Sequence, residues 1–222
     1  KAAGVTSMVQ ISAIGADADS PSVYARTKAK GEAAVREILP QAVILRPSIV
    51  FGPEDDFFNR FASMAVLSPA LPLIGGGKTR FQPVYVGDVA RAVAVAVANP
   101  ASAGQTYELG GPAVLTFRQI LELVLSETQR RRFLLPLPFG VANLIGQLGN
   151  LMALTPIPPP LTTDQVAQLK VDNVANPALP GLAELGIEAT AMESVVGSYL
   201  YRYRKGGQFA EPPELDTGVT PA

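Results

Sequence analysis

The sequence of 222 residues contains no cysteine and no histidine. The lack of cysteine excludes disulfides, thiol nucleophiles and zinc fingers, and it fits a reducing compartment. The lack of histidine excludes any catalytic triad that needs an imidazole base. Proton transfer, if the protein performs any, must therefore use Tyr, Lys, Asp or Glu side chains.

Charge is also scarce, because charged residues make up 17% of the chain and nearly balance to a formal net charge of -1. Hydrophobic residues make up 48%, which is typical of a packed globular protein rather than a disordered one. A nearly neutral chain has no general attraction for nucleic acid, so we predict no nucleic-acid partner. Asp55 and Asp56 are neighbouring carboxylates at a predicted helix start, and we predict no metal site.

Short apolar runs alternate with helical patterns in the first half of the chain. A β-rich run at 5–12, a helix at 22–39 and a buried run at 42–47 predict a parallel strand–helix–strand unit. The pattern then predicts, in chain order, a turn and helix at 51–67, a loop at 68–80, an extended segment at 81–86, a helix at 89–99, a strand at 105–111, and helices at 116–126, 162–169 and 191–204.

Polar residues mark the starts of three of these helices. Asp88 is placed as the N-cap of the helix at 89–99. Thr116 with Gln119, and Thr162 with Gln165, have the spacing of a capping box.

Strands alternate with helices in the first half, and helices dominate the second. This order predicts an α/β fold, with a Rossmann-like parallel sheet and a smaller helical C-terminal subdomain. We assign 1–112 to the sheet domain with its interleaved substrate-side segments, 113–207 to the helical subdomain and 208–222 to a flexible tail.

Tyr24 and Lys28 lie four residues apart on the predicted helix at 22–39, so their side chains share one face. A nearby ammonium lowers the pKa of a tyrosine, and a lysine donates hydrogen bonds to sugar hydroxyls. The pair therefore predicts an acid–base dyad or a cofactor clamp. Packing on the helix surface is the alternative, because Tyr201 and Lys205 have the same spacing.

The order of the segments SPSVYARTKAKGE, RPSIVFGP, GGGKTRFQPVYVGDVARAV and GQTYELGGP resembles the second half of an extended short-chain dehydrogenase/reductase. The resemblance covers roughly residues 1–130. It implies that Tyr24 and Lys28 hold the nicotinamide ribose and that Pro47, Ser48 and Ile49 lie beside the nicotinamide. Ser12 is a further candidate for cofactor binding.

Two features depart from that superfamily. Its members place a Ser or Thr at the end of the strand before the tyrosine, to bind the reacting oxygen of the substrate. Ala13 occupies that slot here, and Ser12, which faces the other way on a strand, restores the hydroxyl only if the alignment shifts by one residue.

The second departure is that no glycine-rich fingerprint for a dinucleotide phosphate follows a strand in this chain. In the superfamily that turn lies near the N-terminus. The chain opens on KAAGV, without a starting methionine or a secretory leader, and we expect it to begin inside a domain whose N-terminal half is absent.

The segment FGVANLIGQLGNLMALT at 139–155 carries no charge. At 17 residues it is too short to cross a bilayer, so we predict no transmembrane segment. Asn143, Gln147 and Asn150 form a polar stripe opposite an apolar face. We predict a helix in the core of the C-terminal subdomain, and the alternative is a helix that docks on a protein partner or a membrane surface.

Two segments concentrate positive charge. QRRRF at 129–133 predicts a solvated helix end, with an anionic partner or lipid headgroups as the alternative. YLYRYRKGGQF at 199–209 interleaves aromatic residues with cations, which favours a protein interface in a chain of neutral net charge.

Four segments, VQISAIGADADSPSVYARTKAKGE, RPSIVFGPEDDFFNRFA, PLTTDQVAQLKVDNV and YLYRYRKGGQF, together resemble the accessory subunit of respiratory complex I known as the alpha-subcomplex subunit 9 family. The resemblance implies a bound NADPH or NADH, other complex I subunits as partners, and a structural or assembly role without established redox turnover. It implies a peripheral, membrane-associated position on the cytoplasmic face of a bacterial inner membrane, or on the matrix side in a mitochondrion.

Two other functions stay open. An active NAD(P)-dependent epimerase/dehydratase or reductase would use Tyr24 as general acid/base, Lys28 to lower its pKa and Ser12 to polarise the substrate. A cofactor-sensing regulatory module would bind the nucleotide without chemistry. The sequence names no substrate and does not distinguish NADP from NAD.

Overall fold

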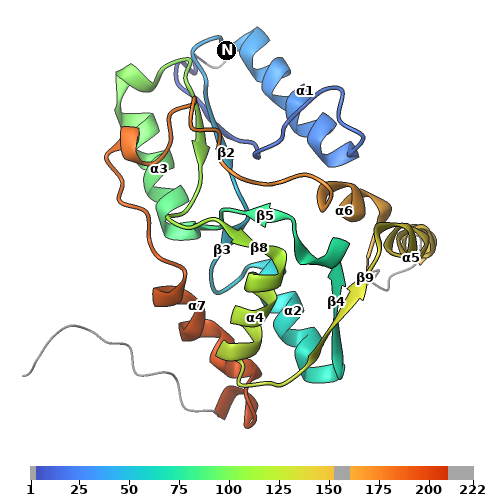
Figure 1. The fold of residues 1–222 in the computed structure, drawn as a ribbon. Coiled ribbons are helices and arrows are strands. Elements are labelled where there is room, and N and C mark those ends of the chain that lie inside the picture. The colour runs from blue at the N-terminus through green and yellow to red at the C-terminus, as the bar shows by residue number, and fades with distance from the viewer. Residues whose placement is uncertain (1–3, 153–160, 210–222) are drawn as a thin grey trace, which may run out of the picture.

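The computed structural model describes residues 4–152 and 161–209, and its centre is a small parallel sheet (Figure 1). The sheet has the order β1-β2-β7, formed by Val9–Ile11, Val43–Pro47 and Thr106–Leu109. Both pairs of neighbouring strands are parallel, as the strand–helix–strand pattern predicted. The predicted α/β class is therefore confirmed.

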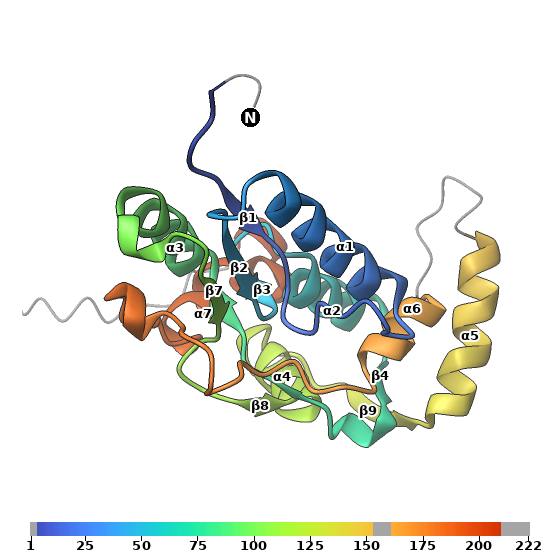
Figure 2. The ribbon, with the colours of Figure 1, turned by 90° about the horizontal axis from the view of Figure 1, so that it is seen from above.

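Helices α1 (Val23–Ile38) and α3 (Val86–Ala98) lie on opposite sides of this sheet (Figure 2). Helix α1 starts as predicted, because the Ser22 side chain accepts a hydrogen bond from the backbone N–H of Ala25. On the α3 side the packing is apolar and includes Val43, Leu45, Ala92 and Ala96.

The prediction that Asp88 is the N-cap of α3 is wrong. The N-cap is Tyr85, and Asp88 lies inside the first turn with a fully buried side chain. Its carboxylate accepts hydrogen bonds from Arg91 and from both the backbone N–H and the hydroxyl of Thr190. Asp88 therefore fastens a distant C-terminal segment to the helix instead of ending the helix.

Three two-stranded sheets and the remaining helices surround this unit. β3 (Val50–Phe51) pairs with β6 (Val84–Tyr85), β4 (Ala70–Ile74) with β9 (Phe133–Leu137), and β5 (Arg80–Phe81) with β8 (Leu115–Thr116). The other α-helices are α2 (Asp56–Leu67), α4 (Phe117–Glu127), α5 (Phe139–Met152), α6 (Thr163–Gln168) and α7 (Glu193–Leu200). Short 3-10 helices occupy Gly75–Gly77, Pro100–Ser102, Ala183–Leu185, Tyr201–Tyr203 and Gly207–Phe209.

The prediction of a plain loop at 68–80 is wrong, because β4 forms within it. Its partner β9 is parallel and about sixty residues further along the chain, with Ala70 opposite Phe133. Pro72 is tolerated in β4 because proline is confined to edge strands, and β4 has a neighbour on one side only.

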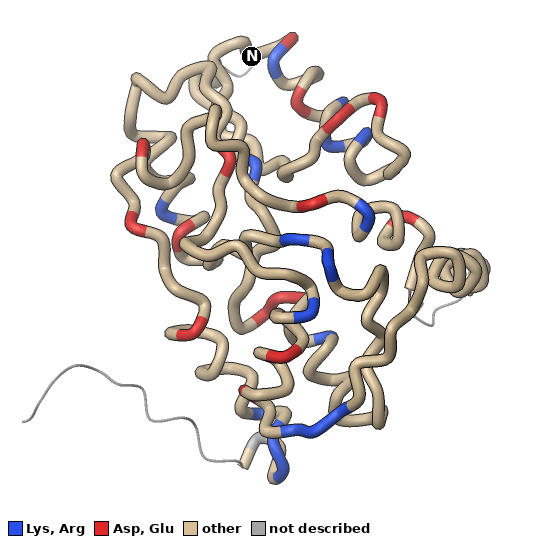
Figure 3. Tube along the Cα trace, viewed as in Figure 1, with Lys and Arg blue, Asp and Glu red and all other residues tan. Residues whose placement is uncertain are grey.

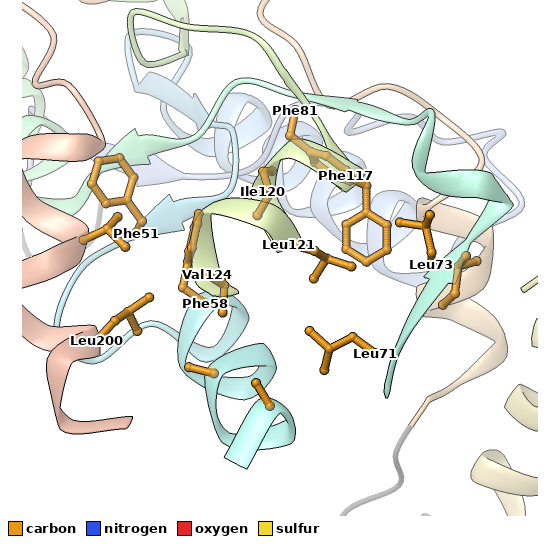
Figure 4. Packing of buried hydrophobic residues seen from close by; sticks show 14 of the residues in the cluster. Phe51, Phe58, Leu71, Leu73, Phe81, Phe117, Ile120, Leu121, Val124 and Leu200 are labelled. Atoms are coloured by element: carbon orange, nitrogen blue, oxygen red, sulfur yellow. The ribbon is translucent and has the colours of Figure 1, made fainter. Parts of the chain in front are cut away.

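The larger core lies between α2, α4, α7 and strand β4 (Figure 4). Phe58 from α2, Leu121 and Val124 from α4, and Leu200 from α7 are fully buried in it. Helix α4 starts with the capping box predicted for Thr116 and Gln119, and α6 starts with the second box that the sequence predicted.

Helix α5 contradicts the prediction of a core helix. The residues that it buries are Ala142, Gly146 and Gly149, which form a narrow stripe of small side chains facing α6. Asn150, from the predicted polar stripe, exchanges hydrogen bonds with Thr163 at the start of α6. The apolar face is exposed, and its members are Val141, Leu144, Ile145, Leu148 and Leu151. The predicted end at 153–155 and most of the predicted tail, 210–222, lie outside the described residues.

No helix among the described residues combines the length and the apolar character that a membrane crossing requires.

Candidate functional site

Tyr24 and Lys28 lie on the first two turns of α1 and do share a face. The Lys28 ammonium nitrogen is 5.5 Å from the centroid of the Tyr24 ring, which is a cation–π contact. Neither side chain donates a hydrogen bond to another described residue. Tyr24 is half-exposed, and partial burial raises the pKa of its phenol above the usual value.

Ser12 lies at the end of β1, under the middle of α1. Its backbone N–H donates to the carbonyl oxygen of Leu45, and its side chain is 2% exposed. The hydroxyl forms no well-aligned hydrogen bond to a described residue, although it lies close enough to the Glu32 carboxylate to help lower the pKa of that group. Glu32 is eight residues beyond Tyr24, and the neighbouring Ala13 is also buried.

The segment Pro47–Ile49 leaves the end of β2 and is held by an asparagine that sequence reasoning missed. Ser48 Oγ lies 2.6 Å from Asn173 Oδ1 and 3.0 Å from the Asn173 carbonyl oxygen, and it can donate to either. The backbone N–H of Ile49 donates to the same Oδ1 at 3.1 Å. Asn173 lies beyond α6, and no sequence signal joins it to a segment 125 residues earlier.

A charged group that the sequence analysis also missed lies between α1 and the sheet. Arg46 on β2 forms two parallel hydrogen bonds to Glu32 on α1, Nε to Oε1 at 2.9 Å and Nη2 to Oε2 at 2.7 Å. A second ion pair joins Arg46 to Glu108 on β7 at 3.5 Å. The sequence did indicate a buried ion pair, because an arginine inside the apolar run VILRP needs buried partners.

The contacts between Arg46 and Glu32 shift the pKa of both side chains toward the charged form. Burial alone would raise the pKa of Glu32, but the hydrogen bonds and charge of Arg46 outweigh it and hold the pKa below the usual value. The Glu32 hydrogen bond likewise raises the pKa of Arg46, against the opposing effect of burial. Glu108 accepts a further hydrogen bond from the backbone N–H of Asn176. The charges are therefore fixed and lie under the helix that carries Tyr24 and Lys28.

A family model described as the RmlD substrate binding domain matches residues 15–142. The chain belongs to that family. Membership places it in the extended short-chain dehydrogenase/reductase superfamily, as its motif order predicted. The matched range includes Tyr24, Lys28 and the segment Pro47–Ile49, but it does not include Ser12.

The resemblance to the alpha-subcomplex subunit 9 family is also confirmed by relatives that align with most of the chain. The mitochondrial NADH dehydrogenase (ubiquinone) 1 alpha subcomplex subunit 9 of Mus musculus is 37% identical over 205 residues, covering 92% of this chain and 53% of the mouse protein. The Arabidopsis thaliana protein of the same name is 35% identical over 210 residues, covering 92% of this chain and 52% of its own length. The chain thus spans about half the length of these relatives.

Solved structures share the fold. The crystal structure of gox2253 superimposes with a TM-score of 0.60 at 19% identity and covers 95% of this chain and 69% of its own. DesIV, a dTDP-glucose 4,6-dehydratase from Streptomyces venezuelae solved with NAD bound, gives 0.52 at 24% identity, covering 62% of this chain and 49% of its own. Likeness at these identities shows the fold alone.

Proposed function

We propose that this chain is the nicotinamide-holding part of an accessory subunit of respiratory NADH:quinone oxidoreductase, without redox turnover of its own. One observation carries the proposal: Tyr24 and Lys28 contact each other but donate no hydrogen bond to another described residue, while the Ser12 side chain is buried beside Glu32 of α1. The names of the relatives support the respiratory assembly.

The donor set fits NADPH or NADH. The Lys28 ammonium and the Tyr24 hydroxyl come from residues one helical turn apart, both partly exposed and without hydrogen bonds to other described residues. Both groups can donate to sugar hydroxyls. The nucleotide would supply a hydride donor when bound. In this chain Lys28 and Tyr24 would hold its ribose, and Pro47, Ser48 and Ile49 would form the wall beside the nicotinamide.

Three features of the same site support the proposed absence of turnover. A tyrosine that acts as a base needs a lowered pKa, and here burial raises the pKa of Tyr24. Lys28 lies over the face of the ring, where it contacts π electrons. Ser12 is buried toward Glu32, and Ala13 offers no hydroxyl to polarise a carbonyl.

The exposed face of α5 fits a subunit of a larger assembly. Soluble monomers rarely expose a continuous apolar surface of this kind, and rows of leucines on a helix pack against partner proteins. We infer that another subunit covers Leu144, Leu148 and Leu151. The protein would then be peripheral, on the cytoplasmic side of a bacterial inner membrane or on the matrix side in a mitochondrion.

The test of the cofactor measures nicotinamide content in the assembly isolated from membranes. We expect Lys28→Met to retain about 10- to 100-fold less nucleotide at limiting concentration, because it removes a charge-assisted hydrogen bond. Lys30→Met removes an exposed lysine from the same helix and is the matched control. Equal retention by both variants would refute the clamp.

A separate assay tests the absence of turnover. We expect no conversion of nucleotide sugars or ketones by the isolated protein, and no change in assembly in Tyr24→Phe. Conversion that Tyr24→Phe abolishes would establish an active epimerase/dehydratase or reductase instead. Recovery as a free monomer that never copurifies with respiratory subunits would favour a cofactor-sensing regulator.

A further inference from the structure

Positive charge collects at the end of the molecule farthest from the α1 site (Figure 3). The segment between α4 and β9 contributes Arg130, Arg131 and Arg132, and the segment after α7 contributes Arg202, Arg204 and Lys205. These are six of the 18 Lys and Arg residues in a chain whose formal net charge is -1. We call this surface the basic end.

Hydrogen bonds fix the basic end without neutralising it. Arg130 Nε donates to the carbonyl oxygen of Tyr203, and Arg132 Nε donates to that of Ala65 at 2.7 Å each. Arg202 likewise donates to a backbone carbonyl and to an amide oxygen. Carbonyl and amide acceptors carry no formal charge, so these guanidinium groups keep theirs.

Few described carboxylates lie close to the basic end. Glu127 forms an ion pair with Arg204 at 3.9 Å, and Glu122 pairs with Arg118 on its own helix at 3.7 Å. Within residues 4–152 and 161–209, no carboxylate forms an ion pair with the three consecutive arginines 130–132. Among the described residues, cations therefore outnumber carboxylates at the basic end.

Large apolar side chains protrude from the same surface. Leu67 is 84% exposed, Phe133 is 80% exposed and Phe209 is 86% exposed. Leu67 and Phe133 come from neighbouring segments, because the backbone N–H of Phe133 donates to the carbonyl oxygen of Pro69, two residues beyond Leu67. Protruding side chains of this size need a matching pocket in a protein partner, whereas a fluid lipid layer accepts them without one.

We propose that the basic end docks on an anionic lipid surface, with the cations among headgroup phosphates and Leu67 and Phe133 inserted at the level of the glycerol groups. Electrostatic attraction and apolar insertion act together. Cations alone hold a protein weakly at a membrane, and inserted side chains alone do not select an anionic surface. The docking site is distinct from the nicotinamide site and does not require a bound nucleotide.

The test measures co-sedimentation of the full chain with vesicles. One set is phosphatidylcholine alone, and the other contains about one part phosphatidylglycerol to two parts phosphatidylcholine. We expect binding to the anionic vesicles only, weakened as salt is raised. Arg131→Gln should weaken partitioning about fivefold, and Arg131→Gln with Lys205→Gln about 25-fold.

The control variants distinguish the effect of the basic end from the effect of the overall charge of the protein. Lys30→Gln removes the same charge from an exposed position on α1 and should change partitioning less than twofold. Phe133→Ser should weaken binding to anionic vesicles while leaving its salt dependence intact. Equal losses in Lys30→Gln and Arg131→Gln, or no loss in Phe133→Ser, would overturn the proposal.

A last arm replaces vesicles with soluble poly-glutamate. Binding to poly-glutamate without binding to anionic vesicles would overturn the lipid assignment in favour of an acidic protein surface. Nicotinamide content, measured in the same Arg131→Gln sample, should be unchanged, so that failure of this proposal and failure of the cofactor proposal remain distinguishable.

Discussion

The ion pairs under α1 lead to a prediction that tests the energetics of the sheet. Arg46→Leu keeps an apolar stem in the space of the guanidinium but removes both hydrogen bonds to Glu32 and the ion pair to Glu108. Both carboxylates then remain under the helix without a cation. The substitution therefore leaves buried negative charges without a partner, which costs more than the loss of a contact at the surface.

The magnitude follows from burial. The side chains of Arg46, Glu32 and Glu108 are 23%, 10% and 8% exposed. Removing one partner of a buried pair costs about 3–5 kcal/mol, and the partial exposure of Arg46 favours the lower limit, about 3 kcal/mol. Arg80→Leu is the matched control, because its ion pair with Asp172 is largely exposed and contributes at most about 1 kcal/mol.

Urea unfolding followed by far-ultraviolet circular dichroism measures both variants. The loss in free energy of unfolding caused by Arg46→Leu should become smaller as the pH falls from neutral. In the native protein the pKa of Glu32 is lowered, so its contribution to stability is present above the unfolded pKa of about 4.3 and is lost as pH falls through the folded pKa. In the variant burial raises the pKa of Glu32, so acidification from neutral pH protonates it and restores part of the lost stability.

Two results would refute this reasoning. Equal destabilisation by Arg46→Leu and Arg80→Leu would show that the buried group behaves as a surface pair. A destabilisation by Arg46→Leu that stays constant between pH 7 and about pH 4.5 would show that no buried carboxylate carries the cost.

Two further predictions concern contacts that hold segments of the C-terminal half in place. Gly146→Ala should speed amide hydrogen exchange in α6 about tenfold or more, since the new Cβ would lie 2.8 Å from the backbone nitrogen of Thr163. Gly140→Ala is the control: its Cβ meets open space, so exchange in α6 should stay unchanged or become slower. Asp88→Ala should lower the free energy of unfolding by about 2–3 kcal/mol in urea denaturation, because it removes a buried carboxylate that accepts two hydrogen bonds from the half-buried Thr190. Asp88→Asn should lose less, and equal losses would show that the acceptor is unimportant.

Local signals predicted the local features of the fold. Ser22 and Pro40 bound α1 to within a residue or two, and the Thr116 capping box starts α4 where expected. These features depend on contacts between residues at most four positions apart, so they can be predicted from short sequence patterns. The Tyr24–Lys28 pairing was predictable for the same reason, because helical spacing brings the two side chains together.

Features that depend on distant partners were not predictable. Ser48 meets Asn173 from 125 residues away, and Asp88 meets Thr190 from 102 residues away. Strand β4 has an ordinary apolar sequence, and only its pairing with β9 makes it a strand. For α5, periodicity located an apolar face, but the helix packs through its stripe of small residues instead. That stripe was visible in the sequence as Ala142, Gly146 and Gly149.

The strand order also constrains how the protein is made. Strand β2 lies between β1 and β7, so its second hydrogen-bonding edge is open until synthesis has passed residue 109. During that interval a growing chain presents a short apolar strand with an arginine whose second carboxylate has not yet emerged. Such an edge invites pairing with a neighbouring nascent chain, and translation pauses within residues 48–105 should raise the fraction that aggregates.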